Sequence, residues 1–359
     1  MCRGAFFPPL FLRQGPTSHI AVVGICDATA AAEDPDGLDW KELERLVIES
    51  KPLSEMDPKR ALGKDGRFGL AVEREGLLMR NTMHMRVQAD AFVPAGGRPG
   101  SINANNVKAY LLPDGTPSSR IIVEGANLFL TAQARKILSL ENKCLIVKDS
   151  SANKCGVVTS SYEVLGGMIL TKDEFISVKD EYVKEVLKRL RYIAAQEATY
   201  LMREWRTGRA PVLPEACIAV SRDIIRLADA VHAKAHDDTL VEWVASLLPL
   251  DPLMRALPKF KGSRGELLKE KLPPAYLASL IAKVVASECI YREGPSFFSP
   301  QDDADIGSRA IDYVQAVLEI DSMASGLLKS GLPDVARVLK LAAPRAIIEH
   351  GVKSVHDLP

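Results

Sequence analysis

The stretch that decides the fold runs from Ile121 to Gly167 and reads IIVEGANLFLTAQARKILSLENKCLIVKDSSANKCGVVTSSYEVLGG. Two apolar, strand-like runs each give way to small, hydrogen-bonding residues, and each of these turns leads into a helical pattern. The turns are Glu124 to Asn127 and Asp149 to Gly156. Strand, helix and strand in this order predict a parallel sheet, whose ligands lie at the carboxyl ends of the strands. We therefore expect function at these two turns.

The composition is that of an ordinary globular protein and argues against some partners. The 359 residues are 47% hydrophobic and 26% charged, which is enough to bury a sizeable core and suggests about two domains. Lys and Arg total 46, as do Asp and Glu, so the near-zero net charge disfavours nucleic acid and anionic membranes as partners. No apolar run approaches the ~20 residues of a membrane helix. Six scattered cysteines without a CxxC pair indicate reduced thiols, and hence a soluble protein of a reducing compartment, mitochondrial or cytoplasmic.

Residues 1–19 differ from the rest of the chain. They contain arginine but no acidic residue, which is typical of a transit peptide, whereas Pro8 and Pro9 oppose an amphipathic helix. We expect a disordered or non-native leader here, with a targeting peptide as the alternative. The remaining chain is expected to form a partial NAD-binding, Rossmann-like domain over residues 20–167 and a helical carboxyl-terminal region over residues 168–359.

The run from Ile20 to Cys26 is continuously apolar and predicts a buried parallel strand. Asp27 follows it at once, and an acidic residue at this place in dinucleotide-binding folds hydrogen-bonds a ribose hydroxyl. The alternative is a plain turn, because Asp also begins turns. Residues 38–49 then carry leucines and a valine on one helical face and predict a helix that covers the sheet.

The next strand is expected over residues 89–95, after a glycine-rich and charged stretch, 61–78, that carries no clear pattern. Pro94 and Ala95 lie where the chain leaves the sheet, and the glycines that follow permit a ligand to approach the backbone. Ser101 is a candidate helix cap. Strand-like runs thus alternate with helical connections, which implies a doubly wound parallel sheet. Because no GxGxxG turn is present, the sheet is expected to lack the first strand of a Rossmann fold.

Three motifs in this order resemble the glutamate dehydrogenase family, and most closely its large-subunit, NAD-specific members with long helical extensions. They are DAFVPAGGRPGSIN from Asp90, VEGAN from Val123 and DSSANKCGVVTSSYE from Asp149, and GICDATAAAEDPDGLDW from Gly24 accompanies them. The resemblance implies NAD-dependent oxidative deamination of L-glutamate to 2-oxoglutarate and ammonia. It also implies a homo-oligomer in the full-length enzyme, of which this chain would be the carboxyl-terminal part.

The same resemblance implies a role for individual residues. Asp27 would hold the adenosine ribose, and Pro94 with Ala95 would line the cofactor cleft. Asn127 and Asn153 would meet the nicotinamide half of NAD. Ser160 would hydrogen-bond the distal carboxylate of glutamate.

The chain also departs from the family pattern. Cys155 stands where the family commonly has a glycine, and its side chain is expected to narrow the site. The catalytic lysine and aspartate of the family lie in a substrate domain upstream of the nucleotide fold, so no catalytic residue is assigned and little turnover is expected of the chain alone. A non-catalytic nucleotide-binding or assembly module derived from this family is the alternative.

The second half of the chain reads as helices with apolar stripes that form a core. Thr171 to Glu174 is a capping-box pattern that opens a long helix ending before Gly208. Further helices are expected over residues 213–236, after Pro273-Pro274 and over 311–328. His232 and His236 are four residues apart, but no glutamate or third ligand accompanies them, so no metal site is expected.

Overall fold

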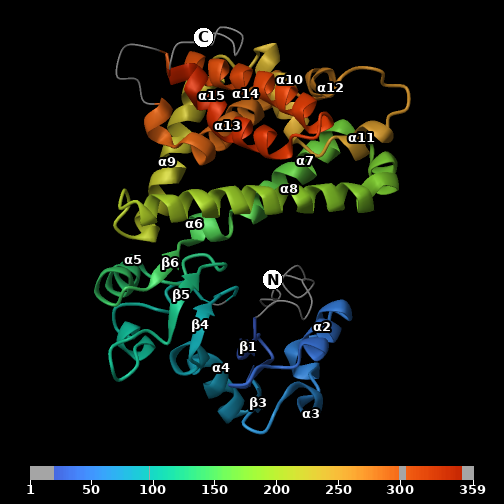
Figure 1. Cartoon of the computed structure of the whole chain (residues 1–359). Helices are drawn as coiled ribbons and strands as arrows, with labels where there is room; N and C mark the ends of the chain where they lie inside the picture. Colours follow the sequence, from blue (N-terminus) through green and yellow to red (C-terminus); the bar gives the residue numbers. More distant parts are fainter. Residues whose placement is uncertain (1–19, 97, 299–304, 350–359) are drawn as a thin grey trace. The chain divides into compact units, whose positions relative to one another are not determined.

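A computed structural model describes residues 20–96, 98–298 and 305–349, and the predicted leader therefore lies outside the described residues (Figure 1). The chain divides into two compact units. Unit 1 is drawn from Met1–Lys154 and Ala210–Cys217, and unit 2 from Cys155–Arg209 and Ile218–Pro359. Residue 167, where the sequence analysis puts its boundary, thus lies within unit 2.

Unit 1 begins with an antiparallel sheet of strands β1 (Gly24–Cys26), β2 (Ala30–Glu33) and β3 (Arg67–Leu70) in that order. The prediction that residues 20–26 form a strand of the parallel sheet is therefore wrong. The Asp27 carboxylate accepts hydrogen bonds from the backbone N–H groups of Thr29 (2.7 Å) and Ala30 (3.0 Å). This turn reverses the direction of the chain, so β1 pairs antiparallel with β2, the next strand in the sequence.

Short helices cover this sheet. Helix α2 (Trp40–Ile48) buries Leu43 and Leu46, which confirms the helix predicted there. The stretch 61–78, which has no clear pattern in the sequence, contains β3 and the start of a helix. The smaller elements of this part are η1 (Leu53–Glu55), α3 (Pro58–Ala61) and α4 (Arg74–Arg86).

The parallel sheet of unit 1 contains β4 (Ala89–Phe92), β5 (Ser119–Val123) and β6 (Leu145–Val147) in that order. The strand, helix and strand predicted from residue 121 onwards are confirmed, and the fold is α/β. Between β5 and β6 lie α5 (Ala132–Lys136) and the π-helical η3 (Ile137–Glu141). After β6 come α6 (Asp149–Ala152) and α7 (Lys154–Ile169).

The helix predicted to start at Ser101 is absent. The Ser101 hydroxyl donates to the Arg98 carbonyl at 2.6 Å, and Ile102 forms an isolated parallel bridge with Leu130. Because Ile102 takes a strand-like backbone, no helix can begin at this residue. Between β4 and β5, the only helical turn among the described residues is the 3-10 turn η2 (Val107–Tyr110).

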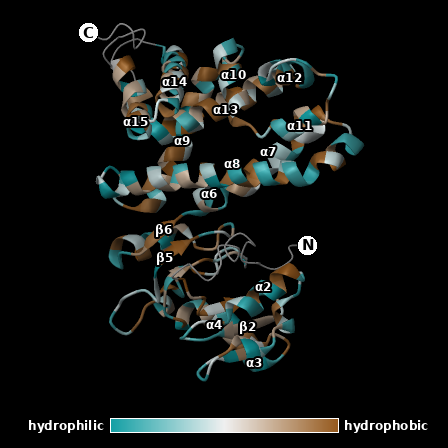
Figure 2. Cartoon of the chain, turned by 45° about the vertical axis from the view of Figure 1, so that its right-hand side comes forward, coloured by the Kyte–Doolittle hydropathy of each residue, from teal (hydrophilic) through white to brown (hydrophobic). Residues whose placement is uncertain are grey.

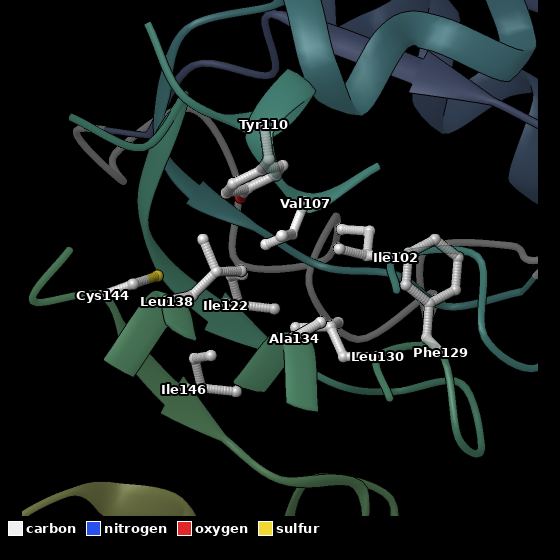
Figure 3. Packing of buried hydrophobic residues seen from close by; sticks show 10 residues of the cluster. All are labelled: Ile102, Val107, Tyr110, Ile122, Phe129, Leu130, Ala134, Leu138, Cys144 and Ile146. Atoms are coloured by element: carbon white, nitrogen blue, oxygen red, sulfur yellow. The ribbon is translucent and has the colours of Figure 1, made fainter. Parts of the chain in front are cut away.

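The parallel sheet has its own hydrophobic core, centred on Ile122 of β5 and Ile146 of β6, both fully buried (Figure 3). Side chains from the loops and helices on either side of β5 gather around these two residues. The other labelled members are Ile102, Val107, Tyr110, Phe129, Leu130, Ala134, Leu138 and Cys144.

Unit 2 is built of helices whose surfaces alternate between hydrophobic and hydrophilic residues (Figure 2). The long helix α8 (Lys172–Arg206) starts with the predicted capping box of Thr171 and Glu174 and ends before Gly208 as expected. The helices predicted over residues 213–236, after Pro273-Pro274 and over 311–328 are confirmed as α9 (Leu213–His232), whose residues up to Cys217 belong to unit 1, α13 (Pro274–Glu293) and α14 (Ile306–Lys329). The other helices of this region were not predicted individually. They are α10 (Asp238–Leu247), α11 (Asp251–Arg255), α12 (Arg264–Lys271), η4 (Pro295–Phe298) and α15 (Pro333–Glu349).

Two kinds of feature are absent from the described residues. No helix there is long and apolar enough to cross a membrane. In the same part of the chain, no group of three or more His, Cys, Asp or Glu side chains is placed to hold a metal ion.

The half-buried His84 is expected to make the stability of unit 1 depend on pH. The ring of His84 on α4 stacks on Phe92 at 5.9 Å and meets the edge of Phe129 at 6.0 Å, and its buried Nε2 makes no hydrogen bond. Burial lowers the pKa of this imidazole below its ordinary value. The unfolded chain then binds a proton that the folded chain does not, so stability falls as pH drops through about 6.5.

We therefore expect the unfolding free energy, measured with urea, to decline between about pH 7.5 and pH 5.5. His84→Phe should flatten this part of the profile, because it removes the group that takes up the proton. His236→Gln, at an exposed position, is the control and should leave the slope unchanged. An equally steep profile in His84→Phe would contradict the assignment.

Candidate functional site

The loops that follow the three parallel strands meet at the carboxyl edge of the sheet. After β4, the buried Pro94 offers its carbonyl oxygen to the Ala126 N–H, which lies after β5, at 2.6 Å. After β5, the Glu124 N–H donates to the carbonyl of Val147 in β6 at 3.0 Å. Main-chain hydrogen bonds thus tie the loop after β4 to the loop after β5, and that second loop to the end of β6.

Gly125 lies where the first two loops approach each other most closely. A Cβ atom at this position would stand 3.3 Å from the Pro94 carbonyl oxygen and 3.5 Å from the Ala95 Cα. The first of these distances is tighter than an ordinary contact, so a side chain here would require the Pro94 carbonyl to move slightly, and the glycine lets the two loops pack. Pro94 and Ala95, which are predicted to lie at this edge, do lie beside the turn formed by Glu124 to Asn127.

The two asparagines predicted to act together do contact each other. The Asn153 Nδ2, between α6 and α7, donates to the Asn127 Oδ1 at 2.5 Å and to the Gly125 carbonyl at 3.3 Å. Asn127 is exposed and Asn153 is half-buried. These bonds use the donor of Asn153 and the acceptor of Asn127. The Asn127 Nδ2 donor and the Asn153 Oδ1 acceptor make no hydrogen bond to any described protein group, so a ligand can reach both.

A charged pair beneath these loops was not anticipated as part of the site. Glu124 is fully buried, and its carboxylate accepts from the Arg135 Nε at 2.7 Å and from the Arg135 Nη2 at 3.1 Å. The same carboxylate also accepts from the Leu130 N–H at 3.1 Å. A glutamate directly after a buried strand, with an arginine in the following helix, is the sequence signal for this pair.

A second buried carboxylate, Asp149, lies at the end of β6. Its Oδ2 accepts from the Leu128 N–H at 2.9 Å, its Oδ1 accepts from the Ser150 N–H at 2.9 Å, and Lys148 forms an ion pair with it. Burial alone would raise the pKa of Asp149, but Lys148 and the backbone donors hold it below its ordinary value. The group is therefore an anion that fixes the backbone beside Asn127.

Asp27 belongs to the other sheet of unit 1 and lies in the turn between its strands β1 and β2. Its Oδ1 accepts from the N–H and the hydroxyl of Thr29 and from the Ala30 N–H, and its Oδ2 accepts from the Leu53 N–H at 2.9 Å. Burial would raise its pKa, yet these hydrogen bonds hold the pKa below its ordinary value. Both oxygens serve the local fold, as in the turn reading of this residue, and its contact with a ribose stays a prediction.

Ser160 and Cys155 lie on α7, within unit 2. The exposed Ser160 hydroxyl donates to the Gly156 carbonyl one turn back, at 3.4 Å. The Cys155 Sγ lies 3.9 Å from the Leu190 carbonyl of α8, so this side chain links two helices of unit 2. The roles predicted for both residues in the site stay predictions.

Comparison with known proteins gives the chain its family. The family model described as Glutamate/Leucine/Phenylalanine/Valine dehydrogenase matches residues 16–229. The chain is 32% identical over 302 residues to a probable NAD-specific glutamate dehydrogenase of Schizosaccharomyces pombe. The aligned region covers 77% of this chain and 26% of that protein.

Other relatives give the same picture. Identity is 31% to the glutamate dehydrogenase 2 of Dictyostelium discoideum, over 76% of this chain and 28% of that protein. It is also 31% to the NAD-specific glutamate dehydrogenase of Saccharomyces cerevisiae, over 76% and 27%. The chain spans about a quarter of the length of these relatives. With the carboxyl-edge site and the match over residues 16–229, these findings establish that the chain belongs to the Glutamate/Leucine/Phenylalanine/Valine dehydrogenase family.

Proposed function

We propose that this chain supplies the nicotinamide side of the active site of an NAD-dependent glutamate dehydrogenase, which deaminates L-glutamate oxidatively to 2-oxoglutarate and ammonia. When bound, NAD supplies the hydride acceptor of such a reaction. The observation that carries the proposal is the hydrogen-bonded pair of Asn127 and Asn153 at the carboxyl edge of the parallel sheet. The names of the relatives support the reaction and the cofactor.

The asparagine pair matches the chemistry of a primary carboxamide. A carboxamide has one carbonyl acceptor and one amino donor, and the pair offers the complementary Asn127 Nδ2 donor and Asn153 Oδ1 acceptor. The mutual hydrogen bond also orients both amides before the ligand arrives, which lowers the entropy cost of binding. The two side chains thus fit the nicotinamide end of NAD.

The other site residues belong to the same proposal. Pro94 and Ala95 line the cofactor cleft, Asp27 meets the adenosine ribose and favours NAD over NADP, and the Ser160 hydroxyl donates to the distal carboxylate of glutamate. No residue of this chain is assigned the transfer of protons. The enzyme would be a homo-oligomer located in the mitochondrion or the cytoplasm.

The asparagine pair is tested by NAD binding to the chain, measured by isothermal titration calorimetry. We expect Asn127→Ala and Asn153→Ala each to raise the Kd for NAD about tenfold, the loss of roughly one hydrogen bond. The analogue that carries a carboxylate in place of the carboxamide should bind the native chain more weakly than NAD, because it has no donor for the Asn153 Oδ1. Asn153→Ala should reduce this preference.

Asn81→Ala is the matched control, since Asn81 is an exposed asparagine on helix α4, outside the loops that follow the three parallel strands. It should leave both affinities unchanged. Equal affinity of the native chain for NAD and for the carboxylate analogue would reject carboxamide recognition by this pair.

The second candidate function is a non-catalytic nucleotide-binding or assembly module. Asn127 is exposed beside the hydrophobic core of the parallel sheet, and this position favours nucleotide binding under both candidate functions. Incubation of the 359-residue chain with NAD and glutamate tests both candidate functions against a third possibility, that the chain is an active dehydrogenase on its own. We expect binding without robust NAD reduction, and robust reduction would mean that this chain holds the proton-transfer groups.

A further inference from the structure

The buried carboxylate of Glu124 is placed at the root of the loop that carries Asn127. Glu124 directly follows β5 and is fully buried, and the arginine that neutralises it, Arg135, is itself only 8% exposed in its side chain. A buried ion pair is a poor source of stability, because the two charges lose their hydration. The presence of the buried Glu124–Arg135 pair therefore needs an explanation other than a contribution to the stability of the fold.

The contacts of Glu124 hold both ends of the loop that runs from Glu124 to Leu130. Its N–H donates to Val147 of β6, and its side chain accepts from the Leu130 N–H six residues later. One residue therefore fixes both ends of the loop. The Arg135 Nη2 also lies 4.0 Å from the Asp149 Oδ1. Asp149 in turn accepts a hydrogen bond from the N–H of Leu128, in the middle of the loop.

The loop needs this restraint because its backbone is strained. Leu128, directly after Asn127, has φ +55° and a side chain that is 57% exposed. A left-handed backbone is unfavourable for leucine and persists only where the surroundings hold it. No burial of the leucine side chain offsets this cost, so hydrogen bonds must maintain the conformation. They are the bonds of the loop to Glu124 and Asp149 and the bond from the Gly100 N–H to the Leu128 carbonyl at 2.8 Å.

We propose that Glu124 is a positioning residue, which uses Arg135 and the Leu130 N–H to hold the Asn127 amide against Asn153 for cofactor binding. The proposal rests on the proposed function, since the ligand it serves is NAD. Glu124 itself touches no ligand: its effect reaches the ligand through the loop.

The chain offers a matched control in Glu42. This glutamate is also fully buried, pairs with an arginine (Arg45, 2.6 Å) and accepts from a backbone N–H (Asp57, 2.9 Å). It lies on α2, beside the antiparallel sheet, and has no contact with the Asn127 loop. Glu42→Gln and Glu124→Gln therefore remove the same kind of charge in the same unit, and only the second should affect the site.

The test compares the two variants in NAD affinity by calorimetry and in amide hydrogen exchange without NAD. We expect Glu124→Gln to raise the Kd for NAD about tenfold and to speed exchange of the Leu128 and Leu130 amides about tenfold, a change of roughly 1.4 kcal/mol. Glu42→Gln should leave both within about twofold, although it also lowers stability. Arg135→Lys, which keeps the charge but not the two-point contact, should fall between Glu124→Gln and the native chain.

The outcomes separate the two proposals. If the native chain does not bind NAD, the proposed function fails, while unchanged exchange at Leu128 and Leu130 in Glu124→Gln overturns the positioning role by itself. An equal loss of NAD affinity in Glu42→Gln and Glu124→Gln also overturns it, because the cause would then be stability. If Glu124→Gln does not fold, Arg135→Lys takes its place, and native-like affinity and exchange in that variant would reject the inference.

Discussion

Replacing Gly76 by alanine is expected to lower the unfolding free energy of unit 1 by about 3 kcal/mol. Gly76 is a buried residue of α4, and a Cβ atom there would lie 2.2 Å from the Leu70 carbonyl oxygen and 2.6 Å from the carbonyl carbon of Gly69. Both are backbone atoms of β3, so no side chain can rotate out of the way. The helix and the strand would have to separate, which opens the packing around them.

Gly167→Ala is the matched control, since it is the same substitution in another helix. A Cβ atom at Gly167 of α7 meets no atom within 4 Å, and the residue is exposed. Alanine should then stabilise the helix by about 0.5 to 1 kcal/mol, because it restricts the unfolded chain and favours helix. Urea unfolding followed by circular dichroism measures both changes. The same sign of effect in the two variants would show that close approach does not govern Gly76.

The sequence predicted the parallel half of unit 1 well because its signal is local. From residue 121 onwards, apolar runs of strand length alternate with polar turns and helical patterns, and each strand of this sheet pairs with the next one along the chain. The hairpin at Asp27 was missed for the opposite reason. Its second strand, Ala30–Glu33, consists mostly of alanine, which gives no strand signal, and only its fully buried position shows its role.

The same distinction applies to the site. The contact of Asn127 with Asn153 follows from topology, because the ends of adjacent parallel strands must meet at one edge. The role of Glu124 does not, because it depends on which of many charged side chains Arg135 reaches after folding. Likewise, the reading of Asp27 as the end of a strand of the parallel sheet depended on a strand pairing that a single sequence cannot provide.

Unit 2 contains a buried charge cluster that the sequence gives no reason to expect. Glu288 of α13 is 3% exposed and accepts hydrogen bonds from the Arg189 Nη2 at 2.7 Å, the Tyr192 hydroxyl at 3.1 Å and the Arg292 Nη2 at 3.2 Å. Arg189 and Tyr192 belong to α8, so the carboxylate joins two helices far apart in the chain. The Arg189 side chain is itself only 11% exposed and depends on Glu288 for its counter-charge.

Glu288→Ala is expected to lower the unfolding free energy of unit 2 by about 3 to 5 kcal/mol, because it leaves the Arg189 guanidinium buried without a counter-charge. The control is Glu181→Ala, which breaks the ion pair of Glu181 with Arg255. Both of those side chains are more than half exposed, at 57% and 59%, so the expected cost is at most about 1 kcal/mol. Urea unfolding of the two variants gives the comparison.

The double variant Glu288→Leu with Arg189→Met decides whether the cost of the single change comes from the stranded charge or from lost packing. If the stranded charge is the cause, removing both partners should recover most of the lost stability, because two apolar side chains of similar size need no hydration. If the cause is lost contact between α8 and α13, the double variant should be as unstable as Glu288→Ala or worse. Recovery would also mean that this cluster contributes little net stability, and that its charges mainly set which face of α13 meets α8.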